Sequence, residues 1–230
     1  MTKSKFIVIE GIDGSGKATQ LKKLSDFLRS KSQEIATFDF PQYSNASSYF
    51  VREYLNGHYG SFQEINPYAA SAFFALDRYD SKNKIIQALT HGKIVLSNRY
   101  VGSNMAHQGS NLKDKNDRED YFKWIENFEF SILSIPKPDL NIILHVSADI
   151  VQNLIDRKDS RNYIDGGAKR DLLESDINHL KKTEATYQEI ASLFPDQFTV
   201  IECMKNNQIM SVEEIHSEIL SLVEKVIKWF

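Results

Sequence analysis

Three glycines and a lysine near the amino terminus have the spacing of a loop that binds phosphate groups. The segment reads Gly11-Ile12-Asp13-Gly14-Ser15-Gly16-Lys17 and directly follows the apolar run Phe6 to Glu10. Glycines let backbone N–H groups approach phosphate oxygens and accept positive φ angles, and the lysine adds a positive point charge. We therefore predict a site for nucleotide phosphates made of Gly11, Gly14, Ser15, Gly16, Lys17, Ala18 and Thr19.

The residue after Lys17 bears on how a metal ion would be held. A Ser or Thr hydroxyl commonly ligates Mg²⁺ at this position, but here the residue is Ala18. Thr19 comes one residue too late to replace it simply. Three alternatives stay open: phosphates and waters alone hold the ion, another side chain takes the place of the hydroxyl, or metal-dependent catalysis is weak.

The composition restricts the classes of partner. The 230 residues carry 28 basic and 31 acidic side chains, a net charge of −3, so no broad positive field favours nucleic acid or a membrane surface. The single cysteine, Cys203, excludes a disulfide within the chain and a thiolate metal cluster. The run Phe6 to Ile9 is too short for a signal peptide or a membrane span, which favours a cytoplasmic location.

Apolar runs of strand length alternate with longer amphipathic segments, a pattern typical of a parallel sheet with crossover helices. We predict one α/β domain over residues 1–230, with a five-stranded parallel sheet between two helical layers. The predicted strands are Phe6 to Glu10, Ile35 to Phe40, Lys93 to Ser97, Leu140 to Val146 and Phe198 to Cys203. We predict one helix that begins near Lys17. Further predicted helices span Pro67 to His91, Glu119 to Leu133, Asp149 to Asp156, Arg170 to Phe194 and Val212 to Phe230.

One segment, Arg157 to Arg170, is polar, glycine-containing and rich in positive charge. Charged loops are usually solvated connectors between helices, and that is one interpretation. The other is a short lid that closes over phosphate groups.

Beyond the phosphate loop itself, the stretch Glu10 to Gln20 resembles the start of the thymidylate kinases, which read E-G-x-D-G-x-G-K-[ST]-T-Q. Further stretches are similar to family motifs in the same order, namely Phe40-Pro41-Gln42-Tyr43, Phe74-Ala75-Leu76-Asp77-Arg78, Asn98-Arg99-Tyr100 and Ser103 to Gly109. The resemblance implies a P-loop nucleoside monophosphate kinase. Such an enzyme transfers the γ-phosphoryl group of ATP, with Mg²⁺, to dTMP, which gives dTDP and ADP, and it pairs as a homodimer.

The resemblance also implies roles for individual residues. Phe74 and Arg78 are four apart, so on one helix face a ring can stack on a pyrimidine while a guanidinium reaches its O4 edge; a core Phe beside a surface Arg is the alternative. The implied catalytic residues are Lys17, Asp13, Arg99, Arg157 and Arg161. The implied substrate-binding residues are Asp13, Phe40, Pro41, Arg52, Phe74, Arg78, Arg99, Ser103, Asn104 and Gln108.

Several positions depart from the family pattern. Tyr43 stands where one form of the family has an arginine, with Arg52 as a possible replacement, and Asn98 stands where the family has an aspartate. His107 takes the place of a Tyr or Phe, and Gly14 follows Asp13 where one branch carries a catalytic arginine. These changes keep two other functions open: a kinase for another deoxynucleoside monophosphate such as dUMP, and a nucleotide-binding paralogue with weak catalysis.

Overall fold

The computed structural model describes residues 4–61, 64–155 and 176–227. The predicted lid at residues 157–170, with Arg157 and Arg161, lies outside the described residues. The same holds for the first residues of the helix that was predicted to begin at Arg170.

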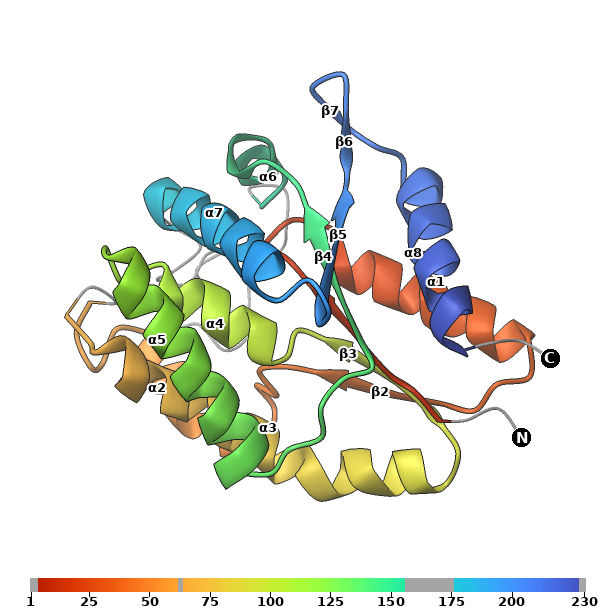
Figure 1. Ribbon diagram of the computed structural model, residues 1–230, viewed down its shortest axis with the longest axis horizontal. Helices are drawn as coiled ribbons and strands as arrows, with labels where there is room; N and C mark the ends of the chain where they lie inside the picture. Colours follow the sequence, from red (N-terminus) through yellow and green to blue (C-terminus); the bar gives the residue numbers. More distant parts are fainter. Residues whose placement is uncertain (1–3, 62–63, 156–175, 228–230) are drawn as a thin grey trace.

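A five-stranded parallel sheet forms the centre of the molecule (Figure 1). Its strands lie in the order β2-β3-β1-β4-β5, and the predicted five-stranded α/β fold is confirmed. The strands are β1 (Phe6–Glu10), β2 (Ile35–Asp39), β3 (Ile94–Asn98), β4 (Leu140–His145) and β5 (Phe198–Glu202). All five residues of β1 are buried, because β1 has strands on both sides and helices over both faces.

Helices form a layer on each side of the sheet. In Figure 1, α1 (Lys17–Ser30) and α8 (Val212–Ile227) lie together on one side, and α4 (Val101–Gly109), α5 (Lys115–Glu126) and α7 (Ile177–Leu193) lie on the other. The long α3 (Pro67–Thr90) contacts both α4 and β3. The shorter elements are the 3₁₀ helix η1 (Ala46–Ser48), α2 (Tyr49–Leu55), the π-helix η2 (Asn127–Ile132), α6 (Ala148–Ile155) and the hairpin of β6 (Met204–Lys205) and β7 (Gln208–Ile209).

Two of the differences between the observed and the predicted helices have identifiable reasons. The helix predicted from Glu119 begins at Lys115, because the Asp114 side chain accepts hydrogen bonds from the backbone N–H groups of Asn116 and Asp117 and so caps it. Helix α4 was not predicted. All nine of its residues are buried, and its polar side chains, Ser103, Asn104, His107 and Gln108, line the cavity, so the helix has no exposed face of charged residues to mark it in the sequence.

The sheet brings the polar motifs together at one edge. The backbone N–H of Arg99, just after β3, donates to the carbonyl of Ile9 in β1, and Asn98 is in register with Asp39 of β2. The carboxyl ends of β1, β2 and β3 therefore adjoin one another, where open α/β sheets bind ligands. Beside this edge, Val51, Tyr54, Leu55 and Ala70 form a small apolar cluster of their own between α2 and α3.

Candidate active site

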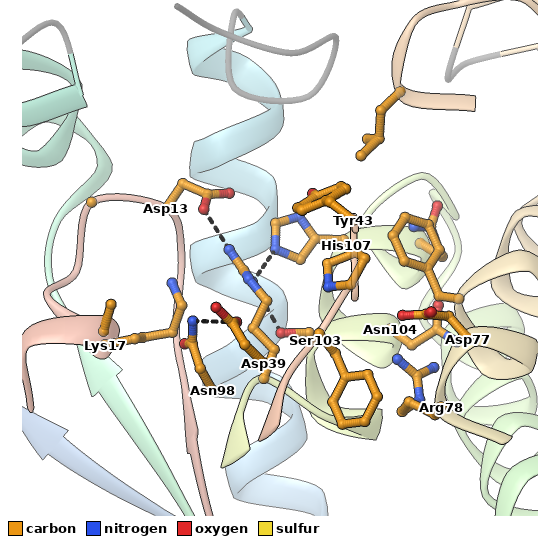
Figure 2. Close-up of a pocket in the computed structure, with 18 of the residues that line it drawn as sticks. Asp13, Lys17, Asp39, Tyr43, Asp77, Arg78, Asn98, Ser103, Asn104 and His107 are labelled. Carbon is orange, nitrogen blue, oxygen red and sulfur yellow. Dashed lines mark hydrogen bonds and ion pairs between the residues drawn. The ribbon is translucent and has the colours of Figure 1, made fainter. Parts of the chain in front are cut away.

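A cavity of about 470 Å³ lies at this edge of the sheet. It extends from the phosphate loop, past the ends of β2 and β3, to α3 and α4 (Figure 2). The predicted residues that line it are Asp13, Gly14, Gly16, Lys17, Ala18, Thr19, Phe40, Pro41, Phe74, Arg78, Arg99, Ser103, Asn104 and Gln108. Three predicted residues in the described part, Gly11, Ser15 and Arg52, are not in its lining.

The phosphate loop has the backbone that its glycines were expected to permit. Gly11, Gly14 and Gly16 have φ angles of 139°, 85° and 89°. A Cβ on Gly11 would also lie 2.7 Å from the backbone oxygen of Leu144, so any side chain there would push the loop off β4. The Lys17 ammonium donates to the carbonyl of Ile12 at 2.8 Å, which keeps its charge against the loop.

Arg99 is a cation in the lining of the cavity. One nitrogen, Nη2, donates to Asp13 Oδ1 at 2.5 Å, and the other, Nη1, donates to Ser103 Oγ at 3.0 Å (Figure 2). Nη1 also lies 3.3 Å from the Gly11 carbonyl, to which it donates. Burial alone would lower the pKa of Arg99, but the Asp13 carboxylate beside it raises the pKa above its ordinary value. Arg99 therefore stays a fixed cation that can bind a phosphate.

His107 also contacts Arg99 and lines the cavity, although it was not among the predicted site residues. Its Nε2 lies 3.1 Å from Arg99 Nη1 and its Nδ1 lies 3.4 Å from His179 Nε2. Burial and the nearby Arg99 charge hold the pKa of His107 well below its usual range. Because arginine can only donate, His107 must be a neutral ring that accepts at Nε2 and carries its proton on Nδ1.

Arg78, in the lining of the cavity, belongs to a buried ion pair. Arg78 donates from Nε and Nη2 to the two carboxylate oxygens of Glu129, each at 2.6 Å, and both side chains are almost fully buried. Asn104 donates from Nδ2 to Glu129 and to the carbonyl of Ser71. Arg78 is therefore buried, and the alternative interpretation, in which it is a surface residue, is wrong. The sequence analysis did not predict Glu129 as a site residue. It lies seven positions after Phe122 and four after Ile125, so helical spacing puts this acidic residue on the buried face, where a carboxylate needs a partner.

Two further carboxylates in the lining were also missed. Asp39, at the end of β2, accepts from Asn98 Nδ2 at 2.7 Å, and burial raises its pKa. Asp77 on α3 accepts from the Gln42 backbone N–H at 2.8 Å and from Ser47 Oγ at 2.6 Å, which fixes the segment after β2. Asp39 belongs to no recognisable local motif, and Asp77, although it lies within the stretch Phe74 to Arg78, was not given a role there.

The structure does not bring Arg52 into the cavity. Its Nη1 donates to the carbonyls of Tyr43 and Asn45 and to the Ser48 hydroxyl, so the guanidinium braces the turn before α2. The expected replacement of the missing arginine at Tyr43 is therefore not supported. Tyr43 itself lines the cavity.

No helix in the described ranges is both long and apolar enough to cross a membrane. Within the same ranges, no group of three or more His, Cys, Asp or Glu side chains could hold a metal ion.

Comparisons with known proteins agree on one family. The thymidylate kinase family model matches residues 9–219. A thymidylate kinase of Mycobacterium tuberculosis is 36% identical over 189 residues, which cover 81% of this chain and 86% of that protein. A probable thymidylate kinase of Pyrococcus horikoshii is 31% identical over 220 residues, which cover 95% of each chain.

A solved thymidylate kinase structure from Candida albicans matches the fold with a TM-score of 0.73 at 20% identity. The match covers 98% of this chain and 93% of that one. At this identity it bears on the fold alone, and it agrees with the sheet described above. The family model and the relatives both span most of the chain, so the chain belongs to the thymidylate kinase family.

Proposed function

We propose that this chain transfers the γ-phosphoryl group of ATP to dTMP, giving dTDP and ADP, within a single kinase domain over residues 1–230. The observation that carries the proposal is that one cavity joins the phosphate loop, Arg99 and the wall formed by Arg78 and Asn104. Donor phosphates, acceptor phosphate and base can therefore share one space. Both substrates are polyanions, so the protein's work is positioning and charge neutralisation.

Each part of the transfer has a matching group in the chain. The loop N–H groups and Lys17 suit the β and γ phosphates of ATP, and Arg99 suits the acceptor phosphate. Asp13 orients Arg99 through their 2.5 Å contact and, by family resemblance, also holds the sugar hydroxyl. The neutral His107 and Ser103 fix the other nitrogen of the same guanidinium. A rigid Arg99 would hold the acceptor oxygen in line with the γ phosphate.

We further propose that Asp39 holds Mg²⁺ with the nucleotide phosphates in place of the hydroxyl that Ala18 lacks. Mg²⁺ prefers oxygen ligands and supplies positive charge to the phosphates when bound. Asp39 Oδ1 is held by Asn98, and Oδ2 makes no hydrogen bond with any residue in the described ranges. A carboxylate beside a phosphate site repels a polyanion unless a cation lies between them, so the donor set fits this ion.

We place the transition-state arginine at Arg157 or Arg161, both outside the described residues, because Gly14 occupies the loop position used by one branch of the family. Closure of a lid arginine over the phosphates would stabilise charge in the transition state and exclude water. We expect Arg157→Ala or Arg161→Ala to lower kcat by at least tenfold and to leave dTMP affinity within about twofold. Steady-state kinetics with dTMP calorimetry would measure both, and a change confined to KM in both variants would remove the lid from the mechanism.

We also propose that the protein acts as a homodimer in the cytoplasm. The exposed outer face of α3 carries Leu76, Tyr79 and Ile86, and the exposed rings of Tyr49 and Phe50 adjoin it. Such a cluster of large apolar side chains is typical of a protein interface. A requirement for ATP supports a cytoplasmic location.

The activity is tested by ADP release with ATP, Mg²⁺ and a panel of dTMP, dUMP, dCMP and dGMP, each against a reaction without acceptor. We expect dTMP to give the highest kcat/KM. Turnover with another monophosphate alone would move the assignment to that acceptor. Binding of ATP and dTMP without turnover would identify a nucleotide-binding paralogue. Lys17→Ala, which removes the loop cation and leaves the base wall intact, is the matched inactive control.

A further inference from the structure

Glu129 links the two residues that face the base end of the cavity. Its side chain is fully buried, comes from the π-helix η2 and pairs with Arg78, but it does not line the cavity itself. No motif contains it, and the phosphate chemistry described above does not use it. A buried carboxylate persists only with a cation or several donors, and Glu129 has both.

The contacts of Glu129 fix how Asn104 is turned. The Asn104 Nδ2 group has two protons, and both are used, on Glu129 Oε1 at 3.0 Å and on the Ser71 carbonyl at 3.0 Å. Its Oδ1 is buried and has no hydrogen-bond partner among the described residues. Because Glu129 can only accept, the amide cannot flip without losing both bonds. Asn104 is thereby left with an acceptor to satisfy.

The same carboxylate fixes Arg78. Nε and Nη2 point at Glu129, and this bidentate pairing sets the plane of the guanidinium. Arg78 also lines the cavity, and Nη1 is the nitrogen that this pairing leaves over. Without Glu129, Arg78 would be a buried cation with no compensating charge and free to turn toward the cavity.

We propose that Glu129 is a positioning residue that makes this wall selective for a pyrimidine with a 4-oxo group and a protonated N3. The inference rests on the proposed function. A 4-oxo group accepts from an arginine nitrogen, and N3–H donates to an amide oxygen. A 4-amino pyrimidine presents a donor and an unprotonated nitrogen instead, so both partners are mismatched and two buried polar groups stay unpaired.

The test is Glu129→Gln, which keeps the shape and removes the charge and one acceptor. The readouts are kcat and KM for dTMP and dCMP, and KM for ATP. We expect KM for dTMP to rise at least tenfold, the dTMP to dCMP ratio of kcat/KM to fall at least tenfold, and KM for ATP to stay within twofold. A merely structural loss would move both substrates' KM values together.

Glu189→Gln is the matched control. Glu189 pairs with Arg118 in the same bidentate manner, at 2.7 and 3.2 Å, and neither residue lines the cavity. We expect it to leave the dTMP to dCMP ratio unchanged. If Glu129→Gln does not fold, Arg78→Lys takes its place, since lysine keeps the charge beside Glu129 but loses the planar fork, and the same fall in the ratio is expected.

An unchanged ratio in a folded Glu129→Gln or Arg78→Lys enzyme would overturn the inference. An equal change in the ratio in Glu189→Gln would do so too. If the wild-type chain has no turnover with dTMP in the same assay, the proposed function fails instead. Failure of this inference is therefore seen in the variants, and failure of the proposed function is seen in the wild-type enzyme.

Discussion

At the scale of single residues, the site is built from charged and amide side chains that lie close together in space but far apart in the sequence. Asp39 and Asn98 are 59 residues apart and Arg78 and Glu129 are 51 apart. The glycines and Lys17 could be predicted because their function depends on local spacing along one loop. Asp39 could not be predicted, because it is a lone acid whose role depends on a partner that only the sheet brings near. The helical spacing of Glu129 indicated that it is buried, but its partner Arg78 could not be read from the sequence, because only helix packing brings the two together.

Removal of the Asp39 charge should weaken the binding of ATP with Mg²⁺ and should not weaken the binding of metal-free ATP. In Asp39→Asn, we expect ATP with Mg²⁺ to bind about tenfold more weakly, because an ion ligand is lost. Metal-free ATP should bind equally well or more tightly, because a negative charge beside the phosphates is removed. Calorimetry with and without a chelator measures both, and Mn²⁺ bound with ATP can be counted independently by electron paramagnetic resonance.

Asp26→Asn is the control for this prediction, since Asp26 is an exposed acid on α1 that pairs with Lys22. It should leave both affinities unchanged. Equal weakening of both forms of ATP in Asp39→Asn would mean that Asp39 shapes the loop and does not hold an ion.

At the scale of elements, α4 connects the strand edge to the buried carboxylate of β1. Glu10 accepts from the Tyr100 backbone N–H at 2.8 Å and from Ser103 Oγ, and these residues flank the start of α4. Gly102 lets the helix approach closely: a Cβ there would lie 2.8 Å from the Phe198 ring and 2.9 Å from Glu10 Oε1. The glycine is thus required by packing and not by its backbone angles.

We expect Gly102→Ala to destabilise the protein, contrary to the usual gain from alanine in a helix. Helix propensity favours alanine by about 1 kcal/mol, but overpacking a rigid ring costs about 1–3 kcal/mol. A net loss of up to about 2 kcal/mol should appear in urea unfolding. The control is Gln87→Ala on the exposed face of α3, which should stay within about 0.5 kcal/mol of wild type. A stabilised Gly102→Ala protein would contradict the close packing of α4.

His145 ties three elements together and gives the fold a pH dependence. From the end of β4, it contacts Glu184 of α7 at 3.0 Å and Glu202 of β5 at 2.6 Å. The bond to Glu184, with that to Glu202, raises the pKa of His145 from 6.5 to about 9. The protonated ring therefore stabilises the native state fully below pH 6.5, and this contribution is lost as the pH rises through 9.

In His145→Gln, this part of the pH dependence should disappear. Because His145 is partly exposed, solvent screening reduces the effect, and we expect wild type to lose about 1–2 kcal/mol more than the variant between pH 6.5 and 9.5. Urea unfolding at a series of pH values measures the difference. Parallel curves for the two proteins would show that the ring is not charged in the native state.

At the scale of the whole molecule, the alternation of apolar runs and amphipathic segments was enough to predict the five strands and the two helical layers. Strand order was not predicted, because nothing in a strand's own residues says which neighbour it pairs with. The order β2-β3-β1-β4-β5 matters most for the site, since it places β1 beside β3 and the phosphate loop beside Arg99.

The long helix α3 relates the site to the proposed dimer. On one side, Phe74, Asp77 and Arg78 line the cavity, while Leu76 and Tyr79 are 45% and 46% exposed on the outer side. A two-fold pairing of this face would bury the exposed residues and hold the helix that carries half of the base wall. Dimer formation and substrate binding should therefore be coupled.

We expect Leu76→Glu to convert a dimer into monomers of 26.4 kDa, because two like charges would meet in an apolar interface. Sedimentation equilibrium over a range of concentrations measures the mass, and dTMP affinity should weaken as the monomer fraction rises. Leu193→Glu, the same change at an exposed leucine of α7, should leave the mass at twice 26.4 kDa. A monomeric wild-type protein that binds dTMP with the same affinity as Leu76→Glu would mean that the exposed face of α3 has no part in holding the site.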